Sequence, residues 1–379
     1  MGFGMLTILY VNAVGGMSGA ERSLLALLDA RDDTQWQAVV AAPEGALLQA
    51  VRARGVPAVP VPLAPLRRPR SLGAAWRTWQ AVRDGRRALR RILHMVQPDL
   101  LHANTTSAML FCPPAPTMPL IWHVRDMTPA FDVWGRQLYR RAARVAVISQ
   151  AVRDVVLPWA DDGGAKILCV SPAVDDRHFS PAPESATVRA ALGLPAELPL
   201  LGLVAQCVPW KRHHLFLDML ELLADRPWHA VIAGAELGVD PAYRRALAAR
   251  LAHPPFTGRV TWVPWQEDAA PLLAALDILV LPSDHEPFGR VLIEAMACAV
   301  PVVAVAEGGP LEIICNGTTG LLAPPTAPAL ATAVARLLDD PALAAALGAA
   351  GRADVHARFS LAQQRSTLTT LYTELLRPT

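Results

Sequence analysis

The feature that most constrains this chain is a repeated pairing of short apolar runs with longer amphipathic stretches. Helical stretches such as Ala20–Ala30 and Trp76–His94 separate several of the runs. The runs are apolar throughout instead of alternating, which is typical of parallel strands covered on both faces. We therefore predict βαβ units and a doubly wound parallel sheet. The strands expected in the first half are Leu6–Val11, Gln37–Ala41, Pro57–Val61, Asp99–Ala103, Leu120–Val124, Arg144–Ile148 and Lys166–Val170.

The pattern stops once and then restarts. Residues 175–200 are rich in proline, alanine and charge, which favours a linker. The strands expected after it are Leu201–Ala205, Ala230–Gly234, Val260–Val263, Asp277–Leu281 and Val300–Val305, followed by helical regions at Asp339–Arg358 and Leu361–Leu376. The fold class predicted is α/β, with two Rossmann-like domains that face a cleft and bind ligands at the carboxyl ends of their strands. The predicted boundaries are 1–180, a linker 181–198, a second domain 199–358 and a C-terminal helix 359–379.

Composition excludes several classes of protein. A chain of 379 residues with 53% hydrophobic residues is too apolar to be disordered, and a net charge of +2 gives no general preference for polyanions. The five cysteines form no CxxC pair, which argues against a disulfide scaffold or a structural zinc site and favours the cytoplasm. The apolar start is expected to be a buried strand and not a signal peptide. No run of eighteen apolar residues occurs, so we expect any membrane contact to be peripheral.

The strongest motif runs from Leu281 to Ile314. It contains Glu286 just past an expected strand and Glu294 eight residues later. Pro287 is expected in the first turn of a helix, and Gly289 leaves room for a ligand against the backbone. Carboxylates accept hydrogen bonds from hydroxyl groups, which suits sugars and ribose. A second helix is expected to start after Gly308 and Gly309, where free N–H groups favour a diphosphate.

Two further strand exits carry polar groups. Gln206 and Lys211 follow the strand Leu201–Ala205, and the lysine supplies a positive charge suited to phosphate oxygens. His123 ends the strand Leu120–Val124, with Asp126 able either to orient it or to cap the next turn. His102 and Asn104 are weaker candidates at the neighbouring strand exit. Taken singly, each of these residues could equally be a structural or a surface residue.

A glycine-rich turn, Gly15–Glu21, lies between the first expected strand and helix. Its glycines permit close approach of a ligand, and Gly16 is a candidate for binding an anion at the helix start. It matches neither the dinucleotide fingerprint nor the P-loop. An ordinary tight turn is the alternative.

The stretch Arg67–Arg91 combines arginines with two tryptophans. This basic amphipathic pattern is typical of helices that lie on membrane surfaces. A solvated arginine-rich face is the alternative, since arginine is abundant throughout the chain. Its arginines are 67, 68, 70, 77, 83, 86, 87, 90 and 91; we select Trp76, Trp79, Arg86, Arg87, Arg90 and Arg91 as candidates for the acceptor or membrane side.

These motifs together resemble the retaining glycosyltransferases of the GT-B fold, in particular glycosyltransferase family 4. The string from Glu286 to Glu294 looks like the family's two glutamates separated by seven residues, and Val-Pro-Trp-Lys211 looks like its phosphate-binding loop. Gly308-Gly309-Pro-Leu-Glu312 is similar to its glycine-rich helix start. Gly15-Gly16 and Trp122-His123 resemble its N-terminal loop and active-site histidine strand. In that family the C-terminal helix returns to pack on the first domain.

The resemblance implies roles for individual residues. Glu294 should bind the nucleotide ribose, Glu286 the hydroxyls of the donor sugar, and Lys211 the diphosphate. His123 should lie by the transferred sugar, so that His123, Glu286 and Lys211 form the catalytic set. Gln206 stands where the family often has arginine. The donor-binding set is Gly16, Gln206, Lys211, Pro264, Glu286, Phe288, Gly289, Glu294 and Gly309.

The function expected is retaining, hexosyltransferase-like transfer of a sugar from a nucleotide-diphosphate sugar to a hydroxyl acceptor. The favoured acceptor is a lipid-linked saccharide or a polysaccharide or glycolipid precursor at the inner face of the plasma membrane. No cofactor is expected, no metal because an Asp-x-Asp motif is absent, and no nucleic acid partner. A nucleotide-sugar epimerase of related fold and a non-catalytic polyanion or membrane-surface binder remain open at this stage. A dinucleotide dehydrogenase is disfavoured by the missing fingerprint.

Overall fold

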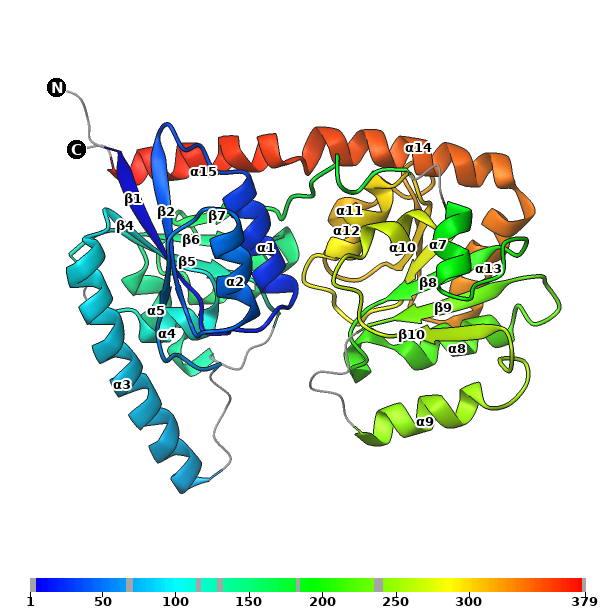
Figure 1. The fold of residues 1–379 in the computed structure, drawn as a ribbon, viewed down its shortest axis with the longest axis horizontal. Coiled ribbons are helices and arrows are strands. Elements are labelled where there is room, and N and C mark those ends of the chain that lie inside the picture. The colour runs from blue at the N-terminus through cyan, green and yellow to red at the C-terminus, as the bar shows by residue number, and fades with distance from the viewer. Residues whose placement is uncertain are drawn as a thin grey trace. The chain divides into compact units, whose positions relative to one another are not determined.

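A computed structural model describes residues 5–65, 71–113, 117–127, 132–181, 185–234 and 241–376. Contacts between Cα atoms divide the chain into two compact units. The first unit is Met1–Ala173 with Leu361–Thr379, and the second is Val174–Ser360. Each unit is built on one parallel sheet with helices packed against it (Figure 1). The prediction of two Rossmann-like α/β domains is confirmed.

The sheet of the first unit has seven strands in the order β3-β2-β1-β4-β5-β6-β7, and all neighbours pair in parallel. The order reverses between β1 and β4, and ligands of open parallel sheets bind at such a switch point. The strands are β1 (Leu6–Val11), β2 (Trp36–Ala42), β3 (Ala58–Pro60), β4 (Leu100–Ala103), β5 (Leu120–Val124), β6 (Arg144–Val147) and β7 (Ile167–Cys169).

Apolar helix faces bury this sheet. The C-terminal helix α15 (Leu361–Leu376) belongs to the first unit, where Leu368, Leu371 and Tyr372 join the core beneath β1 and β2. This confirms the expected return of the last helix. The other helices are α1 (Gly19–Asp29), α2 (Ala46–Ala53), α3 (Leu72–Val96), α4 (Thr106–Phe111), α5 (Asp132–Arg141) and α6 (Gln150–Val156), with a 3-10 turn η2 (Leu157–Trp159).

The sheet of the second unit has six parallel strands in the order β10-β9-β8-β11-β12-β13. Its strands are β8 (Leu200–Val204), β9 (His229–Ala233), β10 (Val260–Val263), β11 (Ile278–Leu281), β12 (Val302–Val305) and β13 (Leu321–Ala323). The sequence pattern missed β13 because an edge strand of three residues gives no periodic signal.

No helix in the described parts of the chain is both long and apolar enough to cross a bilayer. Helices also cover this second sheet. They are α7 (Ser185–Ala191), α8 (His213–Glu221), α9 (Pro241–Leu251), α10 (Ala270–Ala274), α11 (Arg290–Ala297), α12 (Pro310–Ile313), α13 (Ala327–Asp339) and α14 (Pro341–Arg358), with a 3-10 turn η3 (Pro209–Lys211).

Helix α7 lies within the stretch that composition predicts as a linker. Its Arg189 is buried, and its guanidinium donates to the Ala275 carbonyl at 2.8 Å and to the Asp277 carboxylate at 2.7 Å. The same carboxylate accepts from the Leu200 N–H at the start of β8. This arginine therefore ties α7 to the edge of the sheet where β8 and β11 begin.

Candidate functional site

The carboxyl edge of the second sheet brings together Lys211 and Glu286. Lys211 lies in η3 after β8, and Glu286 lies in the loop after β11. The Lys211 ammonium donates to Glu286 Oε2 at 2.5 Å, and its Nζ also lies 4.1 Å from the centre of the Trp210 ring. The side chains are only 14% and 9% exposed, so the opposite charges attract each other with little screening by water.

Two glycines shape the loop that carries Glu286. Gly308 has a positive φ of 69°, and a β-bridge joins it to Glu286. The Gly309 N–H donates to the Glu286 carbonyl at 2.7 Å, so this N–H is engaged within the chain. A Cβ on Gly309 would lie 2.3 Å from the Phe288 Cα, which is closer than atoms can pack. Glycine is therefore required for the loop to lie against the start of α12.

Helix α11 begins at Arg290, so the expectation that Pro287 lies in its first turn is wrong. Gly289 ends the loop with a φ of 103°, a left-handed conformation that glycine adopts at no steric cost. Glu286 consequently lies in the loop and only Glu294 lies on the helix.

Glu294 pairs with a residue that the sequence reasoning did not select. Arg290, one turn earlier on α11, donates to Glu294 Oε1 at 2.9 Å. Glu294 is 7% exposed, and the neighbouring arginine holds its carboxylate in place. The spacing of four residues on a helix predicts such a pair and could have identified Arg290.

Arg212 forms a second ion-pair cluster beside this loop. Its guanidinium contacts the Asp284 carboxylate at 2.9 Å and the Glu307 carboxylate at 3.0 Å. Together with His285, these two acids have the chemistry and spacing of metal ligands. The arginine already neutralises both carboxylates, so an ion-pair cluster accounts for the arrangement as it stands.

Other donor-side candidates of the second unit lie at the same edge of this sheet. Gln206 follows β8 and is partly buried, and Phe288 is buried with its ring 5.6 Å from that of Phe359. Pro264 and Trp265 directly follow β10 and are exposed. These positions fit groups that line the carboxyl ends of strands, where ligands of parallel sheets bind.

The carboxyl edge of the first sheet holds a buried polar network around His123. This side chain is 1% exposed. Its Nδ1 contacts His102 Nε2 at 3.0 Å and Arg125 Nη2 at 3.2 Å. Its Nε2 is buried and has no hydrogen-bond partner among the described residues. His102 and Arg125 therefore orient the imidazole, whereas Asp126, the orienting group suggested by sequence, is exposed.

Three residues that directly follow strands complete this network. Asn12 follows β1, Asn104 follows β4 and Arg125 follows β5. The Arg125 guanidinium donates to Asn104 Oδ1 at 2.7 Å, the Asn104 amide to Asn12 Oδ1 at 2.9 Å, and the Asn12 amide to Glu21 Oε1 at 3.0 Å. All three residues could have been identified in the sequence because each directly follows an expected strand. The sequence reasoning selected only Asn104 as a candidate.

At the glycine turn before α1, the N–H of the capping residue is bonded within the chain. The Ser18 N–H at the helix start donates to the Glu21 carboxylate at 3.1 Å, and Glu21 is 1% exposed. The Glu21 carboxylate thus satisfies this one N–H, as in a capping box. Gly16 remains exposed. A Cβ on Gly15 would lie 2.8 Å from the Glu44 carbonyl oxygen, so this glycine is needed for close packing.

Burial keeps the histidines of the first sheet uncharged. It lowers the pKa of His102 to about 3, with a smaller contribution from the positive charge of Arg125. Burial likewise places the pKa of His123 well below its usual value, helped by Arg125 and His102. The network therefore contains neutral imidazoles at physiological pH.

Comparison with known proteins identifies the family. Residues 17–178 match the sequence profile of Glycosyltransferase Family 4, and residues 184–354 match that of Glycosyl transferases group 1. The lipopolysaccharide core biosynthesis mannosyltransferase LpcC of Rhizobium leguminosarum bv. viciae is 30% identical over 288 residues, covering 70% of this chain and 82% of that protein. The chain belongs to glycosyltransferase family 4.

Other similar proteins agree with this family. A D-inositol 3-phosphate glycosyltransferase of Kineococcus radiotolerans is 36% identical over 239 residues, which are 58% of this chain and 55% of that protein. The chain thus matches about half the length of that relative. The crystal structure of Anabaena HepE in complex with UDP and glucose has a TM-score of 0.82 at 24% identity, covering 98% of this chain and all of that one. At this identity the likeness supports the GT-B fold alone.

The basic helix of this glycosyltransferase is α3 (Figure 1). Among its residues, only Gly85, Leu89 and Ile92 are buried. Trp76 and Trp79 stack with centroids 5.0 Å apart and are 58% and 52% exposed. Arg87, Arg90 and Arg91 are exposed, whereas Arg86 is partly buried and donates to the Leu110 carbonyl at 3.0 Å. Arg67, Arg68 and Arg70 lie outside the described residues.

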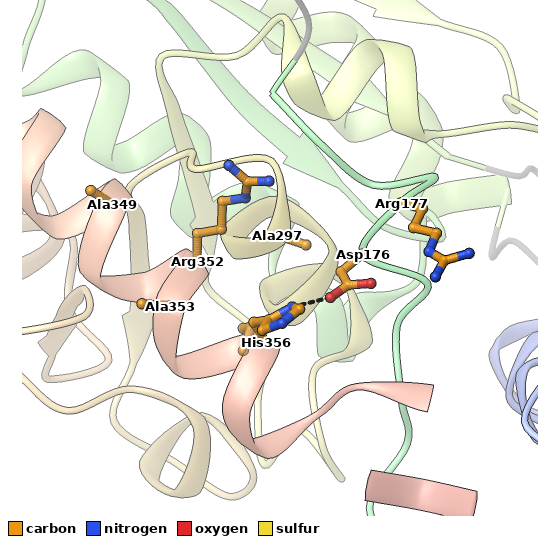
Figure 2. A pocket seen from close by; sticks show the side chains of 8 residues that line it. Asp176, Arg177, Ala297, Ala349, Arg352, Ala353 and His356 are labelled. Carbon is orange, nitrogen blue, oxygen red and sulfur yellow. Dashed lines mark hydrogen bonds and ion pairs between the residues drawn. The ribbon is translucent and has the colours of Figure 1, made fainter. Parts of the chain in front are cut away.

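A further cavity in the second unit was not anticipated from the sequence. It encloses about 560 Å³ beside α14 and is lined by Asp176, Arg177, Ala297, Ala349, Arg352, Ala353, Val355 and His356. Figure 2 shows His356 turned toward Asp176, to which it is hydrogen bonded. Arg352 projects from α14 away from this pair. Arg177, Arg352 and His356 are exposed and Asp176 is partly buried, and the cavity contains none of the donor-side candidates.

Proposed function

We propose that this protein transfers a sugar from a nucleoside-diphosphate sugar to a hydroxyl group of an acceptor, with retention of anomeric configuration. The observation that carries the proposal is the largely buried Lys211–Glu286 pair at the carboxyl edge of a parallel sheet in a member of family 4. The names of similar proteins support the substrate class. LpcC is called a mannosyltransferase, and HepE was solved with UDP-glucose.

Each side of the ion pair suits one part of a donor. The Lys211 ammonium is a compact positive charge that can neutralise a diphosphate, and Glu286 can accept hydrogen bonds from sugar hydroxyls. In the absence of donor the two groups satisfy each other at 2.5 Å. Glu294, held by Arg290, accepts from the ribose in this proposal. The N–H groups of Phe288 and Gly289 add donors for phosphate oxygens.

The proposed reaction breaks the bond between the sugar C1 and the phosphate oxygen, and forms a bond between C1 and the acceptor oxygen on the same face. The electron pair of the breaking bond leaves with the diphosphate. The acceptor proton passes to a leaving phosphate oxygen, so no protein nucleophile is required. Stabilising the charge on the leaving group is then the main task of the protein, and the proposal assigns this role to Lys211.

A thermal-shift screen against UDP-, GDP- and ADP-sugars tests donor binding, because a ligand that binds only the folded state raises the melting temperature. We expect one nucleotide class to raise it. Incubation with that donor and no acceptor should leave the sugar unchanged, whereas release of an epimer would favour a nucleotide-sugar epimerase. Absence of any shift across the three classes contradicts the proposal.

Substitution of Lys211 and Glu286 tests their catalytic assignment. The sequence contains only two lysines, Lys211 and Lys166, and the second lies over the Tyr139 ring within the first unit. We expect Lys211→Ala and Glu286→Ala each to lower kcat at least roughly tenfold, the loss typical of one stabilising group. Lys166→Ala is the matched control and should keep wild-type turnover. Equal activity of all three variants would refute the roles of Lys211 and Glu286.

Metal independence is also part of the proposal. Arg212 neutralises Asp284 and Glu307, which are the acids beside the site with the spacing of metal ligands. Turnover should therefore persist after dialysis against EDTA. Loss of activity that added Mg²⁺ or Mn²⁺ restores would overturn this statement.

The acceptor side is proposed to approach an anionic membrane surface through α3. Exposed Trp76 and Trp79 suit the interface between lipid and water, and exposed arginines attract acidic headgroups. A hollow of about 300 Å³ lies among Trp79, Val82, Arg83, Arg86, Arg87 and Arg90. This surface supports a lipid-linked or otherwise membrane-associated saccharide as acceptor at the cytoplasmic face, as in the synthesis of polysaccharide or glycolipid.

A further inference from the structure

A chain of buried hydrogen bonds leads from the C-terminal helix to His123. Tyr10 Oη contacts Tyr372 Oη at 2.9 Å, and Tyr372 Oη contacts His102 Nδ1 at 2.9 Å. His102 Nε2 in turn contacts His123 Nδ1 at 3.0 Å. All four side chains are at most 1% exposed, so water does not compete for these bonds. The chain joins β1, β4 and β5 to α15 within the first unit.

One contact fixes the direction of every bond in this chain. A guanidinium can only donate, so His123 Nδ1, which lies 3.2 Å from Arg125 Nη2, must accept. His102 Nε2 then donates to the same atom, which leaves His102 Nδ1 without a proton. Tyr372 must donate to His102 Nδ1, and Tyr10 must donate to Tyr372. The proton of the neutral His123 ring therefore sits on Nε2.

We infer that Tyr372 and His102 are positioning residues that hold His123 as a hydrogen-bond donor through Nε2–H toward a substrate oxygen. This N–H is buried and has no partner among the described residues, so a ligand oxygen would satisfy it. Because Nε2 carries the proton, it has no lone pair and cannot remove a proton from the acceptor. The substrate oxygen in question is a hydroxyl of the transferred sugar, a step that rests on the proposed function.

The tautomer can be read without any substrate. Long-range ¹H–¹⁵N correlation spectra of the ¹⁵N-labelled full chain distinguish Nε2–H, Nδ1–H and doubly protonated imidazoles, and the signals that vanish in His102→Gln and His123→Gln give the assignment. We expect both rings to be neutral Nε2–H tautomers at pH 7.5. An Nδ1–H form or a charged ring at His123 would overturn the inference. This readout stands even where donor binding fails.

Activity gives a second, separate test. Tyr372→Phe removes the donor to His102 Nδ1, so we expect kcat to fall roughly tenfold with little change in the donor KM, in line with the loss of one orienting hydrogen bond. Thr370→Ala removes an exposed hydroxyl from the same helix and serves as the control. A spectrum and a kcat for Tyr372→Phe that both equal those of Thr370→Ala would contradict the positioning role.

Substitution of His123 itself separates a donor from a base. The amide of glutamine can present an N–H near the position of Nε2, whereas leucine cannot. We therefore expect His123→Gln to retain more activity than His123→Leu, by about tenfold for one hydrogen bond to a substrate. Equal loss in the two variants would favour a proton-transfer role and contradict the inference.

Discussion

At the scale of single residues, burial determines the charge state of the groups around the two sheet edges. Lys211 and Glu286 form an ion pair with 2.5 Å between Nζ and Oε2. Burial keeps His102 and His123 neutral, with a smaller contribution from the positive charge of Arg125. The opposite outcomes follow from one rule. A buried charge persists only where a partner of opposite charge compensates its lost hydration.

The depressed pKa of His102 predicts a pH dependence of stability. In the unfolded chain this histidine takes up a proton below about pH 6.5, whereas in the folded chain it does so only at about pH 3. Its contribution to stability is therefore present above the unfolded value and is lost as pH falls toward 3, at up to about 1.4 kcal/mol per pH unit. The melting temperature of the wild type should fall more steeply between pH 7.5 and 5 than that of His102→Gln. Parallel pH profiles would contradict this assignment.

At the scale of elements, short loops at strand ends decide where the functional side chains lie. The loop from β11 to α11 carries Glu286 because the Gly308–Gly309 backbone fits tightly against it. Helix α11 starts late, at Arg290, because Gly289 adopts a left-handed conformation. The two glutamates of the motif thus come from a loop and a helix, each held by a cation of its own.

Gly309 gives a prediction at this scale. Gly309→Ala would place a Cβ 2.3 Å from the Phe288 Cα and force the Glu286 loop away from α12. We expect a lower melting temperature and loss of the donor-induced thermal shift. Gly73→Ala is the control, since the nearest atom to the added Cβ is the end of the Arg77 side chain at 3.7 Å and its φ is not in the positive range where side chains are strained. A donor response in Gly309→Ala that matches the control would contradict the proposed role of the loop.

At the scale of the whole molecule, the chain separates into two sheet-based units, and its surface charge is uneven. The net charge is only +2, yet α3 exposes Arg87, Arg90 and Arg91 close to two tryptophans. The partly buried Arg86 is bonded to the Leu110 carbonyl, so it is left intact in the test of membrane contact.

The triple variant Arg87→Gln, Arg90→Gln, Arg91→Gln should weaken binding to phosphatidylcholine vesicles that contain phosphatidylserine by at least roughly tenfold, since each arginine near an anionic surface contributes about 1 kcal/mol. Sedimentation with these vesicles measures the effect. The exposed Arg136, Arg245 and Arg336, changed together to Gln, give the same net charge and serve as the control. Equal vesicle binding by the two triple variants would contradict the proposed surface.

Most of the architecture could be predicted from the sequence because apolar runs mark parallel strands that are buried on both faces. The expected strands match the observed ones to within two residues at each end, and Leu361–Leu376 matches α15. The failures have local causes: β13 is too short to show a pattern, and the left-handed Gly289 delays the start of α11. The family motif also indicated Lys211 and Glu286, since both follow strands of one sheet.

Only the tertiary structure decided how these side chains are paired and protonated. His123 contacts His102, which is 21 residues away, and His102 contacts Tyr372, which is 270 residues away on the last helix. No local pattern links positions so distant, because the residues of a strand indicate whether its faces are buried but not which residues they contact. The proton on His123 Nε2 follows from the position of the Arg125 guanidinium in space. The sequence by itself therefore determined the sheets and the chemistry at their edges, and folding determined which group donates to which.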